Sequence, residues 1–438
     1  MIITFSLFSL GYVLTRLLGI KDKLERLGLG FFLTFGLIGF SLFGLTLLNI
    51  PLNTNIAYMF VGLSCISFLL SIKDFRGIRI SGWWRLIVIL IGISFLTNLY
   101  QPPITWDSLT LYDFRAKLFA NGMSYRDLFL NLSKYGGDFG YYTNGYPPLI
   151  SLVTSLSYLI NESVMPLFSG ALLAFVLLFY SLMTKYASKK VGVIFSLILA
   201  STSIIFYHST IYYSNLFYSI LLSLSVLYLY DFSNTKKTKS LLLCYFLLII
   251  SSWVRMTEPF YILIFVISIM VTIPQKKISN ILLCVGLVVI TLLSRSGWQS
   301  YVNSFSAIEV STQTSKLATA SHTLARPINY LIEIIQTLKA YDYSKTNTII
   351  NYIVRATDIY LYLIVTFVLF GISKYKHSVH NLIFWFVILS CLTMIVGVAY
   401  FSITIPFWNE ITDSARRMMI FTIPCMLFFI GANVEKNK

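Results

Sequence analysis

Charged residues are scarce in this chain, at 11% of its 438 positions, whereas a soluble domain carries roughly 25%. This deficit excludes a soluble globular protein, because most of the surface must face something other than water. Polar stretches are also short, and none is long enough to form a separate soluble domain. In contrast, 57% of the residues are hydrophobic, and apolar runs of roughly 17–25 residues recur along the whole chain. The sequence therefore predicts an integral membrane protein that crosses the bilayer many times.

Several patterns of soluble enzymes and metalloproteins are missing. The five cysteines lie inside apolar runs without a CxxC pair, which is typical of small buried hydrophobic side chains. The four histidines form no ligand set, and no Walker A, HExxH, GxSxG or DxD pattern occurs. The missing DxD disfavours a nucleotide-sugar donor. The formal net charge of +16 would indicate nucleic acid in a soluble protein, but here the basic residues cluster between apolar runs, so we expect no nucleic-acid partner.

The apolar runs predict an all-α membrane fold with about 13 transmembrane helices. Residues 149–160 are too short to span alone and are predicted to form a re-entrant or interfacial helix. The predicted spans are 2–19, 28–50, 53–72, 84–100, 164–184, 191–207, 212–232, 241–254, 259–273, 280–296, 349–371, 380–402 and 418–433.

Basic clusters fall in alternate loops, which the positive-inside rule assigns to the cytoplasm. This assignment puts the N-terminus outside and the C-terminus inside, in a bacterial or archaeal plasma membrane. Long loops at 101–148 and 297–348 then lie outside, so any active site is expected to be extracytoplasmic. The basic clusters are Lys21/Lys23/Arg26, Lys73/Arg76/Arg79/Arg85, Lys185/Lys189/Lys190, Lys236/Lys237/Lys239, Lys276/Lys277, Lys374/Lys376 and Lys436/Lys438.

The expected topology divides the chain into five segments. These are N-terminal transmembrane helices at 1–100, a first extracytoplasmic loop with interfacial helices at 101–163, central transmembrane helices at 164–296, a second extracytoplasmic loop at 297–348, and C-terminal transmembrane helices at 349–438.

The first outer loop carries the most informative residues. Asp107 follows the end of a predicted span. Partial desolvation at the membrane boundary would favour a role of its carboxylate as a general base. Residues 107–120 have helical periodicity, which makes Asp113 and Lys117 i,i+4 neighbours and directs Arg115 towards Asp107. A surface ion pair on an interfacial helix is the alternative interpretation of Asp113 and Lys117.

The segment Trp106-Asp-Ser-Leu-Thr-Leu-Tyr112 resembles the first extracytoplasmic loop of the GT-C glycosyltransferases. These polytopic enzymes take a sugar from a polyprenyl-phosphate carrier, and they include lipid A aminoarabinose transferases and protein O-mannosyltransferases. Asp113 stands where bacterial members often have a histidine. The resemblance places the family's catalytic carboxylate on Asp107.

Further segments resemble the family in order and placement. Tyr146-Pro-Pro-Leu149 is similar to a Y/H-P-P-L that opens the helix after the loop, and Trp408–Met418 is similar to a late loop ending in S-x-x-R. Tyr213-Ser-Asn215 is similar to Y-A-D but has Asn for Asp, which removes a candidate acid. Arg255-Met-Thr-Glu258 is placed like K-x-E-G, with Arg for Lys and Pro for Gly.

The resemblance implies transfer of a sugar to a hydroxyl of a glycan, lipid or protein acceptor. Guanidinium groups suit a leaving phosphate because its charge grows as the bond breaks. The candidate residues are Asp107 and Asp113 for catalysis, Arg416, Arg417, Arg255 and Arg115 for the donor phosphate, and Lys117, Glu258 and Tyr146 in support. Headgroup anchoring is an alternative role for Arg416 and Arg417, and a structural ion pair is one for Arg255 and Glu258.

Metal dependence stays open, because the carboxylates near Asp113 are too few to define a divalent-cation site, and no metal ligand is assigned. Two other function classes compete with the transferase. One is a polysaccharide polymerase or ligase, which would rely more on arginine in its outer loops. The other is a flippase or transporter of lipid-linked sugars, which predicts charged residues along a midplane path.

Overall fold

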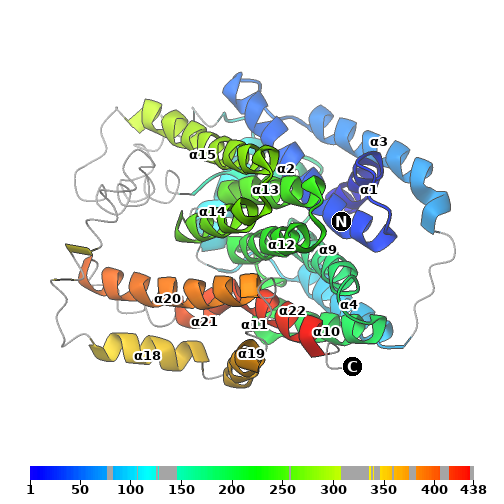
Figure 1. The fold of residues 1–438 in the computed structure, drawn as a ribbon. Coiled ribbons are helices and arrows are strands. Elements are labelled where there is room, and N and C mark those ends of the chain that lie inside the picture. The colour runs from blue at the N-terminus through cyan, green and yellow to red at the C-terminus, as the bar shows by residue number, and fades with distance from the viewer. Residues whose placement is uncertain are drawn as a thin grey trace. The chain divides into compact units, whose positions relative to one another are not determined.

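All the regular elements that the computed structural model describes are helices (Figure 1). The described residues are 1–75, 82–105, 107–124, 127, 146–255, 258–306, 335–336, 339, 346–357, 360–373, 381–404 and 414–434. They form two compact units. The first comprises Met1–Leu221, Ile250–Met256 and Ser300–Ser315, and the second comprises Leu222–Ile249, Thr257–Gln299 and Lys316–Lys438.

The helices follow one another along the chain, and three of them (α12, α13 and α15) contribute to both units. Their bounds are α1 Ile2–Leu17, α2 Lys23–Leu47, α3 Thr54–Ser71, η1 Ile72–Phe75, α4 Trp84–Tyr100, η2 Ser108–Asp113, α5 Phe114–Ala120, α8 Leu149–Leu159, α9 Pro166–Met183, α10 Lys189–Ser201, α11 Ser203–His208, α12 Ser214–Thr235, α13 Thr238–Val254, α14 Glu258–Thr272, η4 Ile273–Gln275, α15 Ile278–Ser306, α18 Thr346–Thr357, α19 Leu361–Ser373, α20 Asn381–Thr404, α21 Ser414–Met419 and α22 Ile423–Val434.

Six of the described helices are long and apolar enough to cross a membrane. The chain is therefore an α-helical membrane protein, as the sequence predicts, but the count of about 13 crossings is not confirmed. Shorter apolar helices occupy several other predicted spans, including those of α1, α4, α13 and α22. The six long segments are Lys23–Leu47, Thr54–Asp74, Pro166–Met183, Ser214–Thr235, Ile278–Trp298 and Leu382–Tyr400.

Two predicted spans are not single helices. The segment predicted at 349–371 is divided between α18 and α19, whose axes differ in direction by 88°. The segment predicted at 191–207 is divided between α10 and α11, because Thr202 has an extended backbone with φ −60° and ψ 118°. Residues 149–160 form a short helix, α8, as predicted, and its side chains from Leu149 to Ser157 are buried.

Glycines set the packing of the first unit. A Cβ built on Gly11 of α1 would lie 2.2 Å from the carbonyl carbon of Gly30 in α2, so the two backbones touch there. Gly28 of α2 approaches α9 in the same way, with its Cβ position 2.4 Å from the carbonyl oxygen of Ala174. Figure 1 shows α1, α2 and α3, drawn in blue, side by side, in agreement with their contacts. Close backbone approach supplies the dispersion contacts that hold apolar helices together in lipid.

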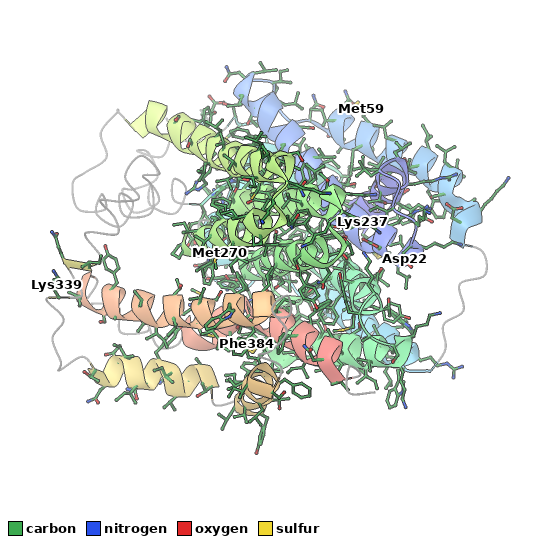
Figure 2. The ribbon with its side chains drawn as sticks, viewed as in Figure 1. Asp22, Met59, Lys237, Met270, Lys339 and Phe384 are labelled. Carbon is green, nitrogen blue, oxygen red and sulfur yellow. The ribbon has the colours of Figure 1, made fainter. Side chains whose placement is uncertain are left out.

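The outer face of α3 is apolar and exposed. Met59, labelled in Figure 2, has an exposed fraction of 63%, and its side chain points away from the neighbouring helices. Tyr58, Leu63 and Leu69 are exposed on the same helix. In a membrane protein such a face is covered by lipid chains.

In the second unit, aromatic rings join three helices. The rings of Phe367 in α19 and Phe384 in α20 stack with their centroids 5.2 Å apart, and the ring of Phe429 in α22 lies 5.1 Å from that of Phe367. Figure 2 labels Phe384 within this cluster. Stacked and edge-to-face rings add specificity to apolar packing.

Candidate functional site

The described part of the predicted first outer loop, the segment before α12 and the end of α13 meet in the first unit. This part of the first unit contains six of the expected site residues with described side chains. They are Asp107, Asp113, Arg115, Lys117, Tyr146 and Arg255. The side chains of Glu258 and Arg416 lie outside the described residues, as does most of the second outer loop. Arg417 is exposed on α21, in the second unit.

Residues 108–113 form η2, a π-helix that continues into α5. The i→i+5 turn is wider than an α-helical turn and is frequent at functional sites. Ser108 ties this segment to the chain before α12, because its hydroxyl donates to the carbonyl oxygen of Tyr212 at 2.6 Å. The sequence predicts a helix over 107–120, and this prediction is confirmed, although its first part is π-helical.

Asp107 is a half-buried carboxylate held by one tyrosine. The hydroxyl of Tyr213 donates a hydrogen bond to Oδ2 of Asp107. The printed sequence offers no local reason for this contact, because the two residues are 106 positions apart.

Asp113 lies in a different environment, since its side chain is almost fully buried. Its carboxylate forms an ion pair with Nζ of Lys117 at 2.7 Å and accepts a hydrogen bond from the hydroxyl of Tyr158. The predicted i,i+4 pair is thus confirmed, but only Lys117 is exposed, while Asp113 faces the protein. Burial, and then the Asp113 carboxylate, raise the pKa of the Tyr158 hydroxyl, so it stays protonated and donates.

Arg115 is fully buried and holds two backbone segments together. Its Nη1 donates to the carbonyl oxygen of Tyr146 at 2.7 Å, and its Nε donates to that of Leu111 at 3.3 Å. The guanidinium carbon also lies 5.9 Å from the ring centroid of Tyr112. These contacts fasten the end of the first outer loop to η2.

Arg255, directly after α13, reaches the same tyrosines from another part of the chain. Its Nη1 donates to the side-chain oxygen of Asn215 in α12, and its guanidinium carbon lies 5.9 Å from the ring centroid of Tyr146. Arg255 is only half-buried, whereas Arg115 is inaccessible.

Tyr112 is the centre of this group of aromatic residues. Its hydroxyl donates to Ser214 at 2.6 Å, and its ring stacks on Tyr212 with centroids 6.0 Å apart. The rings of Tyr146 and Tyr213 lie 6.4 Å and 6.3 Å from it, both edge-on. Burial raises the pKa of Tyr112, so its hydroxyl remains a neutral hydrogen-bond donor.

A buried polar network supports the segment that carries Tyr212 and Tyr213. The amide nitrogen of Asn98 in α4 lies 2.7 Å from the carbonyl oxygen of Ser209 and 2.6 Å from the hydroxyl of Ser169 in α9. Ser94, one turn earlier, bonds the hydroxyls of both serines at 2.8 Å. Sequence reasoning did not single out Asn98 or Ser94. The available signal was their i,i+4 spacing inside an otherwise apolar run.

Asp107 follows one end of α4, and a cluster of charged loops lies at the other end of this helix. α4 begins at Trp84, whose ring is 5.0 Å from that of Tyr180, and it ends at Tyr100, close before Asp107. Its 17 residues separate the two ends by about 25 Å.

Ion pairs join the loops at the Trp84 end. Lys185 pairs with Glu25 at 3.1 Å, and Asp74 lies 3.5 Å and 3.7 Å from the guanidinium groups of Arg16 and Arg26. Asp22, labelled in Figure 2, caps α2 and accepts from Ser181 at 3.0 Å. Three loops that the sequence assigns to the cytoplasmic side therefore meet at one end of this unit.

Within the part of the chain that the structure describes, no three His, Cys, Asp or Glu side chains gather as a metal site. Comparison of the chain with protein-family models, curated proteins and solved structures finds no match in any of the three. The site geometry, together with the sequence resemblance, is therefore the basis for a functional proposal.

Proposed function

We propose that the chain is a membrane glycosyltransferase that moves a sugar from a polyprenyl-phosphate carrier to an acceptor hydroxyl on the extracytoplasmic face. The observation that carries the proposal is the half-buried Asp107 carboxylate, oriented by Tyr213, in a group of tyrosines that also contains the half-buried Arg255. A positioned base and a guanidinium are the two groups that this transfer requires.

In the proposed reaction, the carboxylate of Asp107 takes the proton of the acceptor hydroxyl. The hydroxyl oxygen then forms a bond to the anomeric carbon of the sugar, and the bond between that carbon and the phosphate oxygen breaks. The electron pair leaves with the polyprenyl phosphate, whose growing negative charge is stabilised by Arg255. Inversion at the anomeric carbon follows from a single displacement.

The proposal gives different roles to the remaining candidates. Asp113 and Arg115 are buried and engaged with protein groups, so they hold the loop in shape and do not contact substrate. Lys117 and Tyr146 support them, as the sequence predicts. Arg416 and Arg417 stay candidates for the phosphate clamp, and Glu258 stays a supporting candidate.

The arrangement of charged loops supports the proposed orientation. The ends of α1, α3 and α9 bring their basic residues to the end of the unit that is opposite to Asp107. Because basic loops tend to stay in the cytoplasm, this arrangement supports the proposal that Asp107 lies on the extracytoplasmic side.

Transfer by the purified full-length protein tests the proposal. Polyprenyl-phosphate sugars are supplied in detergent or liposomes, and wild type is compared with Asp107→Asn and with Asp127→Asn. Asp127 is an exposed carboxylate of the same loop whose Oδ2 accepts from Ser124, and the proposal gives it no role. We expect Asp107→Asn to lower the rate by about 10²–10⁴-fold and Asp127→Asn to leave it unchanged.

Two outcomes would contradict the proposal. If the Asp107→Asn protein is folded and transfers sugar at the wild-type rate, Asp107 is not the catalytic base. Movement of lipid-linked sugar across vesicles by the wild type, without transfer, identifies a transporter instead.

A further inference from the structure

Helix α18 of the second unit has a buried face and an apolar exposed face. The helix packs against α20 and α21, and its residues Tyr352 and Ala356, four apart in the chain, are buried (Figure 1). Ile350, Ile353 and Val354 are exposed instead. Their i, i+3 and i+4 spacing puts them side by side on the helix surface, so they form one apolar stripe.

A third face of the same helix is polar. Asn347, Asn351 and Arg355 are exposed at i, i+4 and i+8. Successive residues of an α-helix are rotated by about 100° around its axis, so this polar stripe lies next to the apolar one. The exposed side of α18 is therefore divided lengthwise into an apolar half and a polar half, which is the pattern of a helix at a boundary between hydrocarbon and water.

The direction of α18 agrees with such a boundary. Its 12 residues rise about 18 Å, too little to cross a hydrocarbon core of about 30 Å. The next helix, α19, contains no charged residue, and Val365, Leu369 and Ile372 are exposed along one side of it, as in a helix that runs through lipid. The axes of the two helices differ in direction by 88°. If α19 runs across the bilayer, α18 lies in its plane.

We propose that α18 is an interfacial helix that binds the headgroup layer of the lipid bilayer. Its apolar stripe of Ile350, Ile353 and Val354 enters the boundary of the acyl chains, about 5–10 Å deep, and its polar stripe faces the headgroups and water. The partner is a lipid surface, because only a boundary between two solvents matches both halves of the exposed side at once. A second protein chain on this side would have to cover polar and apolar halves together.

An in-plane α18 also fixes the depth of its neighbour α21. That short helix packs against α18 and carries the exposed Arg417. The headgroup level is the depth at which the phosphate of a lipid-linked donor lies, so Arg417 would be held at the level that its candidate role requires. This consequence rests on the proposed function, whereas the inference about α18 does not.

Depth measurement with nitroxide labels tests the inference. Full-length protein carrying one added cysteine is labelled and reconstituted into liposomes of phosphatidylethanolamine and phosphatidylglycerol. Collisions of the label with oxygen, which dissolves in the acyl chains, are compared with collisions with a water-soluble nickel complex. The variants are Ile350→Cys, Val354→Cys, Asn347→Cys and Asn351→Cys on α18, and Val365→Cys and Leu369→Cys on α19.

The background is chosen so that only the added cysteine reports. Cys65 is exposed and is replaced by serine, while Cys244, Cys284 and Cys425 are buried. The same protein without an added cysteine gives the residual signal, which is subtracted.

We expect the labels of Ile350→Cys and Val354→Cys to collide more with oxygen and to lie at the same depth, because an in-plane helix does not change depth along its axis. The labels of Asn347→Cys and Asn351→Cys should collide more with the nickel complex. The α19 pair, which has the same spacing of four residues, should differ in depth by about 6 Å, since each residue rises about 1.5 Å along a spanning helix.

Three results would overturn the inference. A depth difference of about 6 Å between the Ile350→Cys and Val354→Cys labels would make α18 part of a span. A preference of all four α18 labels for the nickel complex would put the helix in water. Exclusion of both reagents from the apolar stripe would show that protein, such as a second copy of this chain, covers it. None of these measurements depends on sugar transfer, so failure of the proposed function would leave their outcome unchanged.

Discussion

The hydroxyl of Tyr213 donates a hydrogen bond to the carboxylate of Asp107, and this contact joins the start of the first outer loop to the segment that precedes α12. The segment is itself held by Asn98 and Ser94 of α4, which bind Ser209 inside the unit. The candidate base therefore depends for its position on a buried polar network that belongs to neighbouring helices.

Removing the Tyr213 hydroxyl should slow transfer without weakening donor binding. In Tyr213→Phe, Asp107 loses the donor that orients it, and we expect kcat to fall about 10–100-fold while the donor KM changes little. Tyr207→Phe is the matched control, since Tyr207 is exposed and lies close before Tyr213 in the chain. Steady-state kinetics measure both values, and an unchanged kcat in Tyr213→Phe would show that Asp107 needs no such partner.

Asp113 should matter for stability and not for chemistry. Its buried carboxylate pairs with Lys117 and accepts from Tyr158, so Asp113→Asn should lower the free energy of unfolding by about 1–3 kcal/mol. Transfer per folded molecule should remain within about threefold of wild type. Denaturant unfolding and active-fraction kinetics give the two quantities, and a large fall in kcat with unchanged stability would restore Asp113 to the catalytic set.

The contact between α1 and α2 should tolerate no side chain. A Cβ on Gly30 would lie 2.4 Å from the carbonyl carbon of Gly11, so Gly30→Val must push the two helices apart. We expect a loss of about 1–3 kcal/mol in stability, seen as a lower melting temperature and a poorer monodisperse yield. Gly62→Val is the control, because no neighbouring atom lies within 4 Å of its Cβ position. Similar melting temperatures for both variants would refute the close approach.

Cysteine labelling should place the loop that follows α5 and the start of α10 on opposite sides of the membrane. A membrane-impermeant maleimide applied to intact cells should label Asp127→Cys and should fail to label Lys189→Cys until the cells are opened. Both native residues are exposed, and the native Cys65 lies on the apolar helix α3, out of reach of an aqueous reagent. The opposite labelling pattern would invert the proposed orientation and move Asp107 to the cytoplasmic face.

The sequence by itself determined the class of protein and its local pairings. Long apolar runs indicate membrane helices because an unpaired backbone is too costly in lipid, and this required no tertiary information. The Asp113–Lys117 pair was also predictable, since residues four apart lie on one face of a helix. The gathering of the basic loops at one end of the first unit likewise follows from their alternation along the chain.

Only the tertiary structure decided which residues share the site. Tyr213 meets Asp107 and Asn215 meets Arg255 because of how α4, α9, α12 and α13 pack, and periodicity along one segment does not specify the rotation of a helix against its neighbours. The burial of Asp113 and Arg115 depends on the same packing. The sequence named both carboxylates as catalytic candidates, and their different exposure in the folded chain is the physical reason for proposing Asp107 alone as the base.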